Sequence, residues 1–143
     1  MHTALKGALA ALGAVALAGP AAAQFGGPPP PPNTGVPLFT HLTGGSGEGH
    51  ATVVVDPPKG TACYIVNVGA LDNVTAAHIH AGGPGENGRV VVPFDTPEGG
   101  TAGGCAPVTA EVAAALIANP GGYYVNVHTR QFPAGAIRGQ LMK

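Results

Sequence analysis

Charged side chains are scarce in this sequence. Asp, Glu, Lys and Arg together make up 9% of its 143 residues, and the formal net charge is −1. A protein that neutralises phosphates or lies on anionic lipid needs a cluster of basic residues, and none is present. The composition therefore predicts no nucleic-acid partner and no binding to a charged membrane surface.

The side chains of common catalytic motifs are also sparse. Ser46 is the only serine, and it lies among glycines, without the strand-to-helix turn that a serine nucleophile requires. The seven acidic residues are scattered, unlike the carboxylate pairs of glycoside hydrolases. The glycine-rich segment 81–88 lacks the Gly-Lys-Ser ending of a phosphate loop. An enzyme is therefore not the favoured interpretation, and only a bound metal would support a reaction.

Long apolar runs are missing after the first 23 residues. There, His2 and Lys6 precede an apolar stretch at 7–18 and the small residues at 21–23. This pattern predicts a secretory signal peptide over residues 1–23. The alternative, a membrane anchor, requires a run of about 18 apolar residues, which is longer than this one. We expect a mature chain without a membrane span, either periplasmic or secreted.

Residues 24–37 are rich in glycine and proline, with five consecutive prolines at 28–32. Such a segment favours an extended polyproline II conformation, because proline donates no backbone hydrogen bond. We interpret it as a linker. The alternative is a docking site for a proline-recognition domain.

Only two cysteines are present, Cys63 and Cys105. In an exported chain they are expected to form a disulfide, because oxidising compartments favour pairing. The alternatives are two buried thiols or a metal-ligating cysteine, and neither has the C-x-x-C spacing that would support it.

From residue 38 to 143 the chain alternates short β-branched runs with Gly, Pro, Asn and Asp, the pattern of an antiparallel sandwich or barrel. One helix is expected at 109–119, where Thr109 is a suitable N-cap for an alanine-rich stretch. The prediction is an all-β domain of about 7–8 strands with this one helix. The expected strands are 38–43, 50–56, 62–68, 75–80, 89–94, 103–108, 123–128 and 137–141.

Successive side chains of a strand point to opposite faces, so alternation shows which residues share a side. In the expected strands 75–80, 123–128 and 137–141, one set of alternate residues is mainly aliphatic and should line the core. The opposite sets then define a polar face, formed by His78, His80, Asn126, His128, Arg138 and Gln140.

Two histidines one residue apart on a strand lie about 7 Å apart at their Cα atoms and can chelate one ion with a third ligand. If strands 75–80 and 123–128 are neighbours, His78, His80 and His128 form a site suited to copper or zinc. Glu86 would then supply an oxygen ligand or orient a histidine. The alternative is a solvated polar face that contains histidines, with Glu86 in an ordinary surface loop. His41 and His50 lie alone between turn residues, and no role is predicted for them.

Several of these segments resemble the CHRD domain family, which is named after chordin. They are FTHLTG at 39–44, ACYIVNV at 62–68, TAAHIH at 75–80, Gly-Cys at 104–105, YYVNVHT at 123–129 and FPAGAIRGQL at 132–141. The resemblance spans residues 38–141 and implies an immunoglobulin-like β-sandwich. The sequence departs from the family pattern at residues 45–49, where a Glu-Val-Pro-Pro-like stretch is expected. In chordin such domains belong to an extracellular binder of growth factors, but the resemblance carries no activity over to the residues of a single-domain chain; a protein partner is one possibility.

The segment 78–80 is also similar to the copper-ligand strand of Cu/Zn superoxide dismutases, although that enzyme's bridging histidine and zinc loop have no clear counterpart here. The sequence thus predicts an exported CHRD-domain binding protein that coordinates copper or zinc through His78, His80 and His128. Asn126, Arg138 and Gln140 would be neighbours of the ion or part of a contact surface. One alternative is a protein-interaction module without metal, and another is a dismutase-like copper enzyme.

Overall fold

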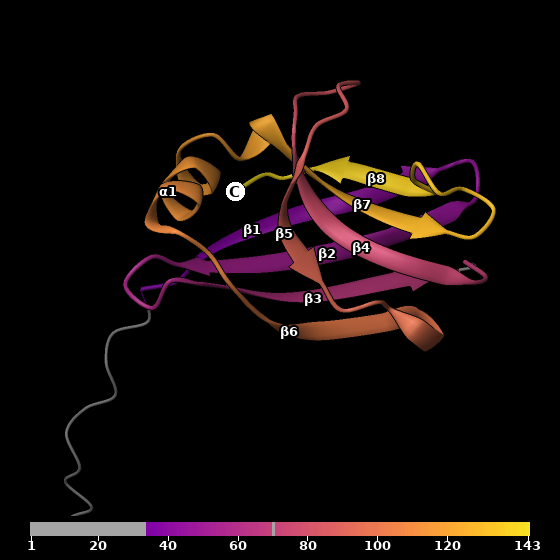
Figure 1. Cartoon of the computed structure of the whole chain (residues 1–143), viewed down its shortest axis with the longest axis horizontal. Coiled ribbons are helices and arrows are strands. Elements are labelled where there is room, and N and C mark those ends of the chain that lie inside the picture. Colours follow the sequence, from indigo (N-terminus) through magenta and orange to yellow (C-terminus); the bar gives the residue numbers. More distant parts are fainter. Residues whose placement is uncertain (1–33, 70) are drawn as a thin grey trace, which may run out of the picture. The chain divides into compact units, whose positions relative to one another are not determined.

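The computed structural model describes residues 34–69 and 71–143 (Figure 1). The predicted signal peptide and residues 24–33 of the predicted linker lie outside this part of the chain. Among the described residues, no helix combines the length and the apolar character needed to cross a bilayer. The elements are β1 (Val36–Gly44), β2 (Gly47–Asp56), β3 (Thr61–Gly69), β4 (Val74–Ala81), β5 (Val90–Phe94), η1 (Glu98–Gly100), β6 (Thr101–Pro107), α1 (Ala110–Ala118), η2 (Pro120–Gly122), β7 (Tyr123–Thr129) and β8 (Ile137–Gln140).

The strands form an antiparallel sheet in the order β5-β4-β7-β8-β1-β2-β3-β6. Its two four-stranded halves are joined by one pair between β1 and β8, Thr43 with Arg138. The edge strands β5 and β6 also contact each other, so the sheet is nearly closed around its interior (Figure 1). The prediction of an all-β sandwich with about 7–8 strands and one helix is confirmed.

Alternation along the strands separates an inner face from an outer face. Ala77 and Ile79 of β4, Val125 and Val127 of β7 and Ile137 of β8 belong to the hydrophobic core. Because neighbouring side chains on a strand point to opposite sides, the histidines of β4 and β7 lie on the outer face. The predicted assignment of these residues to faces is therefore correct.

The first two strands begin earlier than expected. β1 starts at Val36, so the last two residues of the predicted linker belong to a strand. β2 starts at Gly47 rather than at residue 50, because Gly45 and Ser46 alone form the turn of a tight hairpin. This register pairs His41 directly with His50. The expectation that these two histidines stand alone is wrong, since it treated 45–49 as a longer loop.

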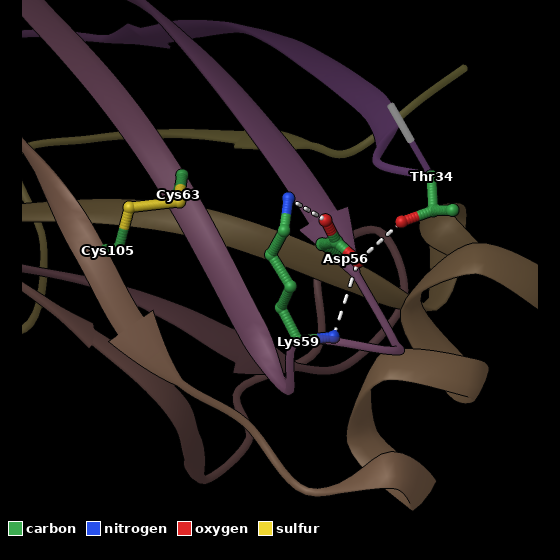
Figure 2. A network of polar contacts seen from close by, with 5 residues as sticks. All are labelled: Thr34, Asp56, Lys59, Cys63 and Cys105. Atoms are coloured by element: carbon green, nitrogen blue, oxygen red, sulfur yellow. Dashed lines mark hydrogen bonds and ion pairs between the residues drawn. A yellow bond between two sulfur atoms is a disulfide. The ribbon is translucent and has the colours of Figure 1, made fainter. Parts of the chain in front are cut away.

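The predicted disulfide is confirmed, and it joins directly paired residues on neighbouring strands. Cys63 of β3 and Cys105 of β6 face each other in the ladder, with Cα atoms 3.9 Å apart (Figure 2). The closed loop of 42 positions contains β4 and β5. The disulfide therefore attaches the edge strand β6 to the centre of its half of the sheet.

A polar network closes the turn between β2 and β3. The carboxylate of Asp56 accepts hydrogen bonds from the Thr34 hydroxyl at 2.8 Å and the Lys59 backbone N–H at 3.3 Å, and it lies 2.7 Å from Lys59 Nζ (Figure 2). The hydrogen bonds of Lys59 and Thr34 lower the pKa of Asp56. The described residues just before β1 are thus attached to the sheet.

The helix α1 forms where the sequence predicts it. The Thr109 hydroxyl accepts a hydrogen bond from the backbone N–H of Val112 at 3.2 Å, which caps the first turn. Ala113 and Leu116 are buried and anchor α1 to the core. The helix ends before Asn119 and Pro120, because proline cannot continue the helical hydrogen-bond pattern.

Candidate metal centre

Strands β4 and β7 are neighbours and bring three imidazoles together. His78 pairs with Asn126, and Ala76, two residues before His78, pairs with His128. One ring nitrogen from each of His78, His80 and His128 lies within 4.8 Å of the other two. The condition that the sequence left open, that these two strands are neighbours, is therefore met, and it places all three histidines in one cluster, which we call the histidine triad.

Backbone carbonyls set the tautomer of two of these rings. His80 Nδ1 lies 2.9 Å from the carbonyl oxygen of Gly88, and His128 Nδ1 lies 2.9 Å from that of Pro133. A carbonyl oxygen only accepts, so both Nδ1 atoms carry the proton and donate it. In a neutral ring, Nε2 then carries a free lone pair.

Three other ring nitrogens of the triad, one from each histidine, are buried and unpartnered. His80 Nε2, His128 Nε2 and His78 Nδ1 are inaccessible to solvent and have no hydrogen-bond partner among the described residues. An unpaired buried polar group costs about 1–3 kcal/mol. Three such atoms on three clustered rings leave donor capacity that a bound cation would use.

The surroundings of His78 disfavour its protonated form. Burial lowers its pKa, and the neighbouring charges of His128 and His80 lower it further. The cause is that a protonated imidazole loses hydration in this position and is repelled by the other two rings. A neutral ring is the form that ligates metal ions.

The β4–β5 loop, residues 82–89, docks on the outer face beside the triad. Arg138 donates to the carbonyl of Glu86 at 3.0 Å, and Gln140 Nε2 donates to that of Gly82 at 3.0 Å. The Gly88 N–H donates to the Tyr124 hydroxyl at 3.2 Å. Arg138 and Gln140 therefore hold the loop whose last turn supplies the carbonyl partner of His80.

Tyr124 packs the triad against β8. Its ring is stacked on His80, with centroids 5.1 Å apart and planes inclined by 9°, and the Arg138 guanidinium carbon lies 3.5 Å from its centroid. This stack restricts rotation of His80. Tyr124 was not predicted to belong to the site, although it lies on the same side of β7 as Asn126 and His128.

The β7–β8 loop, residues 130–136, covers the other side of the triad. Asn126 is 4% exposed and donates from Nδ2 to the carbonyl of Ala134 at 3.1 Å. Gly135 has a φ of +132° and lies so close to Asn126 that a Cβ there would overlap the carboxamide. The same loop provides the Pro133 carbonyl for His128. Asn126 thus positions the loop that orients one of the three rings.

Glu86 faces its own loop. Its carboxylate accepts the Gly83 backbone N–H at 2.8 Å, and the side chain is exposed. Glu86 does not belong to the cluster of potential ligands that the three histidines form. Three neutral imidazoles are a donor set that suits zinc or copper and leaves a coordination position for a further ligand.

Comparison with known proteins gives one family match. The model of the family described as CHRD domain matches residues 19–141, which is most of the chain. No curated protein and no solved structure matches it.

Proposed function

Since the chain belongs to the CHRD domain family, we propose that it is an exported binding protein that coordinates one copper or zinc ion through His78, His80 and His128. The family and the disulfide fit an extracellular or periplasmic protein. The metal is the more specific part of the proposal, and it rests on the geometry of the histidine triad.

Two observations carry the proposal: one ring nitrogen from each of the three histidines lies within 4.8 Å of the other two, and each ring has a buried nitrogen without a hydrogen-bond partner. Leaving all three unpaired would cost several kcal/mol, at about 1–3 kcal/mol each, whereas one ion would satisfy them at once. Metal–nitrogen bonds of about 2.0–2.1 Å bring ligand nitrogens to roughly 3.4 Å of one another. Nitrogens within 4.8 Å reach that spacing through small side-chain rotations.

The partners of the rings also support metal binding. Metal-ligating histidines commonly donate their second ring nitrogen to a carbonyl or carboxylate, which fixes the tautomer and the ring orientation. His80 and His128 both make such a bond, each to a different loop. A surface that merely contains histidines has no need for two loops whose carbonyls fix the tautomers of neighbouring rings.

The test is elemental analysis of the protein purified without a histidine tag and dialysed after exposure to copper or zinc. We expect about one tightly bound ion in the wild type and none in the His78→Ala/His128→Ala variant. Asn67→Ala, which removes an exposed polar side chain from β3, is the matched control and is expected to keep an ion at the triad. Absence of metal from the wild type after reconstitution would refute the proposal, as would equal metal content in the double variant.

A protein-interaction module without metal is the second candidate, and exposed apolar residues favour it. Phe39, Ile65 and Met142 are 45%, 56% and 53% exposed. Phe39 pairs with Thr52, which pairs with Ile65, so the two apolar side chains lie in one row across β1, β2 and β3, with Met142 beside Phe39. A partner of this surface would stay bound in the presence of a chelator and would be lost on Ile65→Asp.

A further inference from the structure

A second pair of imidazoles lies on the outer face of the other half of the sheet. His41 of β1 and His50 of β2 are directly paired, and their rings are stacked with centroids 4.7 Å apart and planes inclined by 15°. His41 Nε2 lies 3.8 Å from Glu48 Oε2, and the two side chains are 51% and 74% exposed. Two imidazoles and a carboxylate are thus grouped at the end of the β1–β2 hairpin.

The backbone register makes this group a permanent feature of the fold. Gly45 and Ser46 form a two-residue turn, so every pair of the hairpin follows from it, including His41 with His50. Glu48 lies two residues before His50 and therefore points to the same side of the sheet. The three side chains are held at adjacent positions, while their exposure leaves the rings free to rotate.

The donor types decide which ligand fits. Imidazole nitrogens and a carboxylate oxygen together suit borderline divalent ions such as Cu²⁺ or Zn²⁺. Two imidazoles already in contact at their ring faces need only side-chain rotation to direct two lone pairs at one ion. The carboxylate adds a third donor and a negative charge, which the triad lacks.

We propose that His41, His50 and Glu48 form a second, solvent-exposed site for a divalent transition-metal ion. It is separate from the triad. The triad lies on β4 and β7 and the second group on β1 and β2, so their nearest strands are separated by β8, which makes two strand spacings or roughly 10 Å across the sheet. One ion therefore cannot contact both groups. Because the donors are exposed and more mobile, this site binds more weakly than the triad.

The competing explanation is that the two rings stack only to stabilise the hairpin. Cross-strand pairs of this kind contribute roughly 0.2–1 kcal/mol without any ligand. Metal titration separates the two explanations, because stacking alone predicts the same copper affinity with and without His50.

The experiment is a Cu²⁺ titration of the full chain by calorimetry in the background His78→Ala/His80→Ala/His128→Ala. We expect this background to bind Cu²⁺ and to lose at least about tenfold in affinity on His50→Ala. Asn67→Ala removes the neighbour of His50 in the next strand and is the matched control, with unchanged affinity. An unchanged affinity in the His50→Ala protein would overturn the proposal.

A second measurement does not depend on removing the triad. In the otherwise wild-type chain, His41→Ala/His50→Ala is expected to lower the copper capacity by one ion, whether or not the triad binds metal. Equal capacities of this double variant and the wild type would also overturn the proposal. The proposed function is tested separately, by whether substitution of the triad histidines removes copper. Failure of the second site can therefore be distinguished from failure of the triad.

Discussion

Gly135 provides a sharp test of how the triad is held. Its φ of +132° is unfavourable for any residue with a side chain, and a Cβ there would lie 2.6 Å from Asn126 Nδ2. Gly135→Ala must therefore displace either the β7–β8 loop or the Asn126 carboxamide. Both movements break the hydrogen bond from Asn126 to the Ala134 carbonyl.

The size of the effect follows from the unfavourable backbone conformation at residue 135 and from the lost hydrogen bond of Asn126. A residue held in an unfavourable backbone region costs about 1–3 kcal/mol. A buried carboxamide that loses its partner costs a further 1–3 kcal/mol or so. We expect Gly135→Ala to lower the free energy of unfolding by about 2–6 kcal/mol. Since the same loop supplies the Pro133 carbonyl to His128, metal affinity should fall by about 10–100-fold.

The assay is urea denaturation followed by circular dichroism, combined with a metal titration of the folded protein. Gly45→Ala is the matched control, because a Cβ at that turn residue meets nothing within 4 Å. It should change the free energy of unfolding by less than about 1 kcal/mol. If Gly135→Ala were no more destabilising than Gly45→Ala, the argument that the Gly135–Asn126 contact positions the loop would be refuted.

Two further predictions concern the scaffold. The Cys63→Ala/Cys105→Ala variant should lose about 4 kcal/mol in urea denaturation, because the disulfide closes a loop of 42 positions, and a loss below about 1 kcal/mol would contradict this. Asp56→Asn should destabilise the protein at neutral pH. Since Lys59 and Thr34 lower the folded pKa of Asp56, its contribution is present above the unfolded pKa of about 3.9 and is lost as the pH falls through the folded pKa. Denaturation curves of wild type and variant should therefore converge at acidic pH, and a constant difference would argue against the network.

Much of the fold could be predicted because its signals are local. Period-two alternation, turn residues and a hydroxyl cap each act over a few positions, so strands such as β4 and β7 and the helix after Thr109 lie close to their predicted places. The cysteine pair was predictable from redox chemistry. The early start of β2 was missed because Gly47-Glu48-Gly49 has little strand propensity, and hairpin pairing with β1 overrides that preference.

The candidate site was only partly predictable. Alternation assigned His78, His80 and His128 to one face, which needs nothing beyond the strands themselves. The sequence does not show that β4 and β7 are neighbours. About forty residues separate the two strands, and any strand order is compatible with the same alternation. The orientation of the rings depends on carbonyls in two loops, and a backbone carbonyl leaves no signal in a residue pattern.

The sequence by itself determined the β-rich domain, its inner and outer faces, the cysteine pair and the polar residues that the faces contain, because each of these depends on side-chain chemistry and short-range periodicity. Only the tertiary structure decided which strands are neighbours, and therefore that three histidines converge, that Tyr124 stacks on one of them and that His41 meets His50. The physical reason is that pairing between strands depends on long-range interactions, namely the packing of the whole core and the docking of loops. Each local segment contributes only a small part of these interactions.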